Sequence, residues 1–383
     1  MNVSDIMRTL VPARIHTAVR LCFAHCESIS AFDDLFGAYL AEIVGLGDRR
    51  EFDLATMRLV AALRNGHTAF DDEWLWRSHG ACLGIAVHDL SEGWTVLRSA
   101  QPSVPIGTRI VEIDDQPVED FVAAKQPYLS ASSGRAARAN LFRRPYLFPD
   151  SVSLQLSDGK RASIRKGEFV LPQSTPATAL KLVTGIPVLK IPSFEADELE
   201  ATAVHFVDQV QHRPALIVDL RGNGGGNTPF KLLARLMDRP YRTWKATTPR
   251  HTGLEIARGM ASTQITVPSE TIEPIRDHYT GRIVLLADRD TGSAAEDFLM
   301  PFKDNGRGMI VGETTMGSSG QPFFQDLGAG MRLWVGAKRQ YFPDGTEFEG
   351  VGIVPDVPMA MTTHDIESGR DRFLEKAIAL ASG

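Results

Sequence analysis

The sequence lacks several features that mark particular classes of protein. It has 3 cysteines among 383 residues, and Cys22, Cys26 and Cys82 form no pair with the two-residue spacing that zinc sites and redox motifs use. No apolar run approaches the ~18 residues of a membrane-spanning helix. The N-terminus lacks the apolar stretch of a signal peptide. We therefore expect neither a disulfide scaffold nor a membrane span, and a cytoplasmic protein unless a leader has been removed.

The sequence also lacks an excess of positive over negative charge. The 41 basic and 47 acidic residues give a formal net charge of -6 and are spread without long blocks, so no broad electropositive surface is available for phosphates. Nucleic acid is therefore not expected as a partner. The histidines form no HExxH motif or comparable ligand cluster, so neither a metal nor another cofactor is predicted.

The texture of the sequence changes twice, which predicts three parts. Residues 1–79 have helical apolar spacing, for example at Phe32, Phe36 and Leu40, and predict a helical N-terminal region. The part from 80 to 170 has short β-rich runs such as LGIAV, WTVL and VSLQL. Its segment PIGTRIVEIDDQPVEDFV resembles half of a PDZ domain, which binds an extended peptide at a sheet edge. A plain β spacer is the alternative.

The third part, residues 171–383, predicts an α/β domain. The runs PVLKI, ALIVDL, RIVLLAD and GMIVGE are apolar and β-branched, and helical patterns separate them. Strands that alternate with helices predict a parallel or mixed sheet covered on both faces. In such sheets, functional sites lie at the carboxyl ends of the strands.

Two strand–turn–helix segments of this part are candidates for chemistry. In TGSAAEDF, Ser293 stands at a helix start, where it is either a nucleophile or a capping-box residue with Glu296. In RGNGGGN, glycines from Gly222 to Gly226 allow a close approach of the backbone. The second spacing departs from GxGxxG at Asn227, and no P-loop lysine follows, so oxyanion binding is favoured over phosphate binding.

These motifs, together with KDNGRGMIVGETTMG and DGTEFEGVGIVPDVPM, resemble the C-terminal processing (tail-specific) proteases and the tricorn core. The resemblance covers most of residues 60 to 360. It implies a ClpP/crotonase-like fold for the α/β domain and a serine peptidase with Ser293 as nucleophile. It further implies an oxyanion hole, for which the amides of Gly225 and Ala294 are the candidates.

The resemblance also suggests how the serine is activated. The tail-specific branch uses a lysine in GETTFGKG, where this chain has Ser318. The tricorn-like branch uses a histidine before the PDZ segment and a glutamate of the closing motif. Asn65-Gly-His67-Thr resembles its DGHT motif, so His67 is the predicted base, with His79 as the rival. Glu349 is the predicted orienting carboxylate, with Glu347 as the rival.

The sequence thus predicts a serine endopeptidase that hydrolyses peptides or unfolded proteins through an acyl-enzyme, using Ser293, His67 and Glu349. A histidine base predicts a catalytic efficiency that rises near its pKa, about 6 to 7. A non-catalytic binding relative of the same fold and a crotonase-like acyl-CoA enzyme are the alternatives. The oligomeric state is open, and a homo-oligomer is one option.

Overall fold

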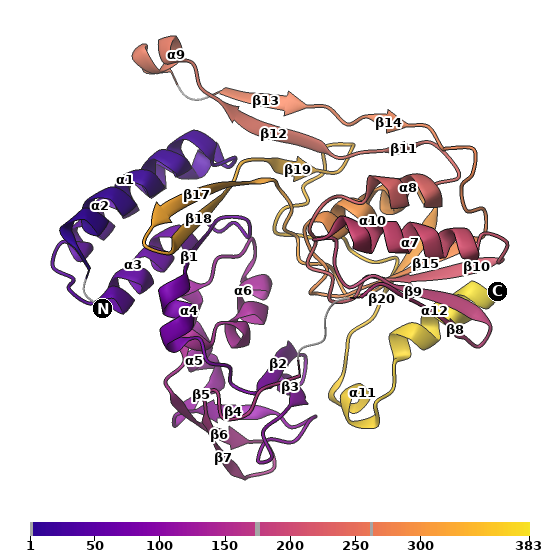
Figure 1. The fold of residues 1–383 in the computed structure, drawn as a ribbon, viewed down its shortest axis with the longest axis horizontal. Helices are drawn as coiled ribbons and strands as arrows, with labels where there is room; N and C mark the ends of the chain where they lie inside the picture. Colours follow the sequence, from indigo (N-terminus) through magenta and orange to yellow (C-terminus); the bar gives the residue numbers. More distant parts are fainter. Residues whose placement is uncertain (1–2, 173–176, 261–262) are drawn as a thin grey trace.

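The N-terminal region of the chain is built mainly from helices. The computed structural model describes residues 3–172, 177–260 and 263–383 (Figure 1). The side chain of Asp48 accepts hydrogen bonds from the amides of Arg50 and Glu51, which explains where the third helix begins. The elements of this region are α1 (Asp5–Cys22), α2 (Ile29–Ile43), α3 (Arg49–Ala61), β1 (Ala69–Asp72) and α4 (Glu73–His79).

The middle part of the chain contains two small antiparallel sheets and two helices. The sheets have the strand orders β2-β3 and β5-β4-β6-β7. The buried side chains of β6 alternate along the strand, as expected of a sheet with one face in the core. The elements are β2 (Ile85–Leu90), β3 (Gly93–Ser99), β4 (Ile110–Ile113), β5 (Gln116–Pro117), α5 (Val118–Lys125), α6 (Gly134–Asn140), β6 (Ser151–Leu156) and β7 (Arg161–Arg165).

The remaining part of the chain combines helices with a mixed sheet of order β20-β16-β15-β10-β9-β8. The strands from β9 to β20 in this order are parallel, and β8 pairs antiparallel with β9. The strands of this sheet and the first helices around it are β8 (Ala179–Val183), β9 (Ile186–Lys190), α7 (Asp197–Gln209), β10 (Ala215–Asp219), α8 (Phe230–Leu236), β15 (Arg282–Ala287), α10 (Ala294–Asn305), β16 (Gly308–Gly312) and β20 (Val357–Pro358).

Helices cover both faces of this sheet. On one face, α7, α8 and α10 contribute buried residues such as Val207, Leu232 and Phe298. On the other face, Phe373 and Ala377 of the C-terminal helix pack on the sheet. Figure 1 shows this helix in yellow across the sheet from α10. The last two helices are α11 (Thr363–Ser368) and α12 (Arg372–Ser382).

A hairpin from the C-terminal half of the chain pairs with a strand of the N-terminal region. Its strand β18 pairs antiparallel with β1, with Ala69 opposite Trp334, in a sheet of order β1-β18-β17. Leu333 of this hairpin lies in the same core as Ile15 and Phe52 of the N-terminal helices and Leu154 of the middle part. This pairing places the loop before β1 next to the C-terminal half of the chain, where His67 of the loop contacts Ser293. The strands are β17 (Pro322–Gly328), β18 (Met331–Gly336) and β19 (Arg339–Tyr341).

A second hairpin extends across the top of the molecule in Figure 1. Its strand β12 pairs with both β13 and β19. Its elements and the short strands beside it are β11 (Tyr241–Arg242), β12 (Lys245–Arg250), α9 (Gly253–Ala257), β13 (Thr263–Val267) and β14 (Thr271–Ile272). Among the described residues, no helix is both long and apolar enough to cross a membrane. Cys22 and Cys82 are free thiols, and the side chain of Cys26 is outside the described part of the chain.

Candidate active site

Ser293 lies in a strained turn between β15 and α10. Its backbone angles are φ 53° and ψ -126°, a region that residues with a Cβ rarely adopt. The turn presents a serine at the carboxyl end of a parallel strand and at the start of a helix, which is also the arrangement of nucleophile elbows in hydrolases. The predicted capping contact with Glu296 is present, because the amide of Ser293 donates to Glu296 Oε2 at 3.1 Å.

Glu296 holds this turn against the loop that follows β16. Its side chain is fully buried, and its carboxylate also accepts from the amides of Gly317 at 2.8 Å and Ser318 at 3.0 Å and from the hydroxyl of Thr315. Burial raises the pKa of Glu296 to about 8. Four donors on one carboxylate fix the Ser293 turn and residues 315–318 as a unit.

His67 reaches Ser293 from the loop before β1. Its Nε2 lies 3.0 Å from Ser293 Oγ, within hydrogen-bond distance. Its Nδ1 lies 3.0 Å from Ser318 Oγ, so both ring nitrogens have a hydroxyl partner. Burial, and secondarily the charge of Lys338, lowers the pKa of His67 to about 4. At neutral pH the ring is therefore an uncharged imidazole that can accept a proton.

Glu349 lies in the same cluster but contacts other groups. Its Oε1 accepts hydrogen bonds from the hydroxyl of Ser132 and from Asn65 Nδ2 at 3.1 Å. Ser132 Oγ lies 3.4 Å from Ser318 Oγ, so two hydroxyls stand between Glu349 and His67. Burial raises the pKa of Glu349 to about 7, against the lowering effect of its Ser132 hydrogen bond.

The two rival residues lie elsewhere. His79 ends α4, where its carbonyl accepts from Lys166 Nζ at 2.9 Å and its ring packs edge-on against Trp74. Glu347 is exposed and pairs with Arg339 at 2.9 Å. Of the predicted residues and their rivals, His67 and Glu349 are therefore the ones that lie in the cluster around Ser293.

The Gly-rich turn after β10 packs directly on the turn that contains Ser293. A Cβ added at Gly225, which has φ 106°, would lie 2.6 Å from Ser293 Cβ, so a side chain has no room there. The amide of Gly225, predicted as an oxyanion donor, instead donates to Asn223 Oδ1 at 2.9 Å. Gly226 and Ala294 line a cavity of about 290 Å³ together with Ser293. No hydrogen bond within the described residues uses the amide of Gly226 or Ala294.

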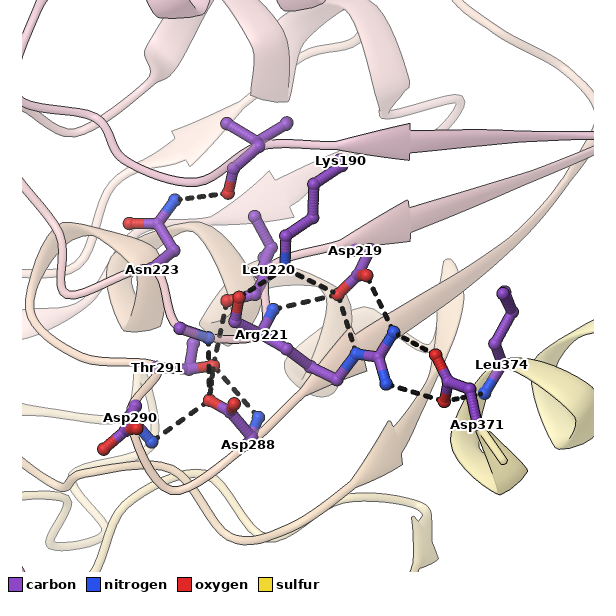
Figure 2. A network of polar contacts seen from close by, with 12 residues as sticks. Lys190, Asp219, Leu220, Arg221, Asn223, Asp288, Asp290, Thr291, Asp371 and Leu374 are labelled. Atoms are coloured by element: carbon purple, nitrogen blue, oxygen red, sulfur yellow. Dashed lines mark hydrogen bonds and ion pairs between the residues drawn. The ribbon is translucent and has the colours of Figure 1, made fainter. Parts of the chain in front are cut away.

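A network of charged side chains contacts the start of the Gly-rich turn (Figure 2). The guanidinium of Arg221 donates to Asp219 at 2.9 Å and, by two bonds of 2.8 Å, to Asp371 at the start of α12. Asp288 accepts from the amide of Gly222 at 3.0 Å, which links this turn to the turn that carries Ser293. Paired, bidentate charge contacts of this kind give a loop a defined geometry.

Sequence reasoning did not assign roles to several residues of this cluster. Ser132 comes from the middle part of the chain and has no motif of its own, so it could be found only from its position in space. Asn65 and Glu296 stand inside the quoted motifs. Asn65 Oδ1 accepts from the amide of His67 at 3.0 Å and from Thr68 Oγ1 at 2.9 Å, which shapes the loop. The sequence signal for Asn65 was that it stands where the DGHT motif has an aspartate.

Comparisons with known proteins agree with this fold. Residues 185–359 match the model of peptidase family S41. The chain is 26% identical over 181 residues to a chloroplastic C-terminal processing peptidase of Tetradesmus obliquus, covering 45% of this chain and 34% of that protein. It is 29% identical over 171 residues to a tricorn protease homologue of Streptomyces coelicolor, covering 44% of this chain and 13% of that protein. The chain thus spans about a third or less of these curated relatives.

A solved structure matches almost the whole chain. Mature CPAF superposes with a TM-score of 0.74 at 16% identity and covers 98% of this chain and 97% of its own, so it supports the fold. The sequence match over residues 185–359 and the fold are both consistent with a serine peptidase. Within this class, the part of the chain that resembles a known family is residues 185–359, which match peptidase family S41. That segment contains Ser293, Ser318 and Glu349, whereas His67 and Ser132 come from outside it.

Proposed function

We propose that the protein is a serine endopeptidase that cleaves peptide bonds through an acyl-enzyme, with Ser293 as nucleophile and His67 as base. The observation that carries this proposal is the 3.0 Å contact between His67 Nε2 and Ser293 Oγ at a strained strand–helix turn. A nucleophile needs a base within hydrogen-bond distance that is unprotonated at the working pH. The low pKa of His67, about 4, meets the second requirement at neutral pH.

Glu349 completes the predicted triad, and we infer that it acts on His67 through Ser318 and Ser132. The amide of Gly66 donates to Ser132 Oγ at 2.8 Å, and Ser132 donates its own proton to Glu349. Ser318 can then donate to Ser132 and accept from His67 Nδ1–H. This order leaves Nε2 as the unprotonated nitrogen that faces Ser293. A chain of aligned hydroxyls would thus do what a directly bonded carboxylate does in other triads, which is to fix the tautomer.

The oxyanion hole in this proposal is formed by the amides of Ala294 and Gly226. Gly226 replaces the predicted Gly225 because the amide of Gly225 is already bonded to Asn223. Both proposed donors line the cavity beside Ser293. Ala294 is the first residue of α10, so the positive end of the helix dipole adds to its effect.

The reaction then follows the ordinary course of acyl transfer. Ser293 Oγ bonds to the scissile carbonyl carbon while His67 Nε2 takes the hydroxyl proton. When the carbon–nitrogen bond breaks, His67 returns this proton to the leaving amine. A water molecule then attacks the ester, passes a proton to His67, and the new acid leaves as the proton returns to Ser293.

The substrate class follows from the same reasoning. An extended peptide, or an unfolded protein segment, is what a peptidase of this type would accept. We propose that residues 80–170 are a PDZ-like module that helps to capture such a chain at a sheet edge. Assembly into a homo-oligomer remains a proposal as well.

The direct test is covalent labelling with a fluorophosphonate probe. The parent should be labelled on Ser293, identified by mass spectrometry of the modified peptide, and should hydrolyse a reduced, unfolded protein. Ser293→Ala should lose both properties, while Ser368→Ala, a matched change on α11, should keep them. A parent that neither labels nor hydrolyses would identify a non-catalytic binding protein of the same fold.

A further inference from the structure

The cavity beside Ser293 contains a cation that has no carboxylate partner. Lys338 lines this cavity of about 290 Å³ together with Ser293, Gly226 and Ala294. It lies between β18 and β19, and its Nζ is 5.1 Å from the ring centroid of Trp244. Within residues 3–172, 177–260 and 263–383, Lys338 forms no ion pair and its ammonium group donates no hydrogen bond. Burial lowers the pKa of Lys338, with Asp297 opposing this effect.

Asp297 is the acidic residue of the same cavity, but its oxygens are already used. Its Oδ1 accepts from Ser319 Oγ at 2.7 Å and from Gln340 Nε2 at 3.0 Å, and its Oδ2 accepts from Thr228 Oγ1 at 2.9 Å. Asp297 is 5% exposed, and burial raises its pKa. It therefore offsets part of the charge of Lys338 without binding it. The ammonium donors of Lys338 are left for another acceptor.

A cation in this position favours a negatively charged ligand. Leaving a charged donor partly buried without a partner costs free energy, and such groups are common where a ligand supplies the partner. The cavity is also bounded by the N-terminus of the 12-residue helix α10, whose dipole favours negative charge. The proposed oxyanion donors open into the same cavity. A group bound by Lys338 must therefore lie within a residue or two of the scissile carbonyl.

We propose that Lys338 binds a carboxylate of the peptide substrate and so makes the enzyme selective for a negatively charged group next to the cleaved bond. The carboxylate is either the side chain of an acidic residue or a free C-terminus close to that bond. This inference rests on the proposed peptidase function. Lys338 is a specificity-determining residue in this scheme and takes no part in proton transfer.

The test uses internally quenched peptides that differ in one group. One pair carries Glu or Gln at the residue beside the cleaved bond, with acetylated and amidated ends. The other pair carries Leu there and ends in a free carboxylate or an amide one residue further on. Cleavage positions are assigned by mass spectrometry. The variants are Lys338→Met, which keeps the length of the side chain without its charge, and Lys231→Met, an exposed lysine of α8 outside the cavity, as the matched control.

The parent should hydrolyse the carboxylate member of one pair at least about tenfold faster in kcat/KM than its neutral partner, a ratio typical of a hydrogen bond to a charged group. The pair that shows the ratio identifies the source of the carboxylate. Lys338→Met should reduce this ratio to nearly one, because it should lower kcat/KM for the carboxylate peptide by about tenfold more than for the neutral peptide. Lys231→Met should keep the ratio.

Two results would overturn the inference while the peptidase function stands. One is a parent that prefers neither carboxylate. The other is a Lys338→Met variant that loses activity equally on both members of a pair, since this would make Lys338 part of the catalytic machinery. Calorimetric binding of the same peptides to Ser293→Ala provides an arm that does not need turnover. If the parent is neither labelled nor able to hydrolyse peptides, the proposed peptidase function is wrong. If the Glu and Gln peptides then also bind Ser293→Ala equally, the inference about Lys338 is wrong as well.

Discussion

Replacement of Glu349 by glutamine should change the pH dependence of hydrolysis in a way that separates the two titrating groups of the site. Burial lowers the pKa of His67 to about 4 and raises that of Glu349 to about 7. The sequence predicted a rise near neutrality from an ordinary imidazole. With these values, His67 already accepts protons above about pH 4 to 5. A rise of kcat/KM near pH 7 would then belong to Glu349, which is charged above that pH and loses its charge as the pH falls through it.

The size of the effect follows from the distance over which Glu349 acts. Two hydroxyls separate it from the imidazolium that forms in the transition state, so the charges stand roughly 6 to 8 Å apart. At an effective dielectric constant of about 20, their attraction is about 2 to 3 kcal/mol. This corresponds to about 30- to 160-fold in rate, because each 1.36 kcal/mol is about tenfold. Glu349→Gln should therefore lower kcat/KM by about this factor at pH 8 and have little effect at pH 5.

The assay is the initial rate of hydrolysis of one quenched peptide from pH 4 to pH 10 at constant ionic strength, with far-ultraviolet circular dichroism at each pH to confirm folding. The parent should show a rise near pH 7 that the variant lacks. If Glu349→Gln keeps both the rise and the parental rate, the carboxylate does not act on His67. If the parent becomes active only above about pH 9, a lysine is the base and the assignment of His67 fails.

Other substitutions test the remaining parts of the site. Ser293→Ala should abolish turnover on an unfolded protein and change the free energy of unfolding by only about 0.5 to 2 kcal/mol. If this variant melts earlier yet cleaves at the parental rate, Ser293 is only a helix cap. His67→Ala should abolish fluorophosphonate labelling and His79→Ala should not. The opposite pattern would move the base to His79. Ser318→Lys should not restore activity to His67→Ala, because the cluster provides no other base arrangement. Recovery of more than about a tenth of the parental rate would contradict this.

The organisation of the α/β domain was predictable because its strands are strongly patterned. The runs ALIVDL and RIVLLAD are almost wholly apolar, as expected of strands with helices on both faces, and β10 and β15 occupy them. The turns after these two strands could be brought together from sequence, since carboxyl ends of parallel strands meet at one edge. Ser293 and the Gly-rich turn are therefore predictable as parts of one site from the pattern of the strands that precede them.

The contacts around His67 depend on pairing between distant parts of the chain, which a single sequence does not reveal. The loop of His67 is positioned by β1, whose partner β18 lies more than 250 residues later. Ser132 reaches Glu349 from the middle part, and the only sequence clue to Ser318 was the absence of a lysine. The choice of Gly225 as oxyanion donor did not anticipate its hydrogen bond to Asn223, because motif spacing does not say where each amide points.

Ser318 connects the choice of base to the rest of the site. Its amide belongs to the set held by Glu296, and its hydroxyl lies 3.0 Å from His67 Nδ1. A lysine here would place an ammonium, which only donates, against a nitrogen that must itself donate if Nε2 is to accept from Ser293. A serine can accept from His67 and pass its own proton toward Glu349. In this cluster, the proposed histidine base and a lysine at position 318 would thus require opposite hydrogen-bond roles at His67 Nδ1. Changing Ser318 to lysine alone would therefore not exchange a histidine base for a lysine base.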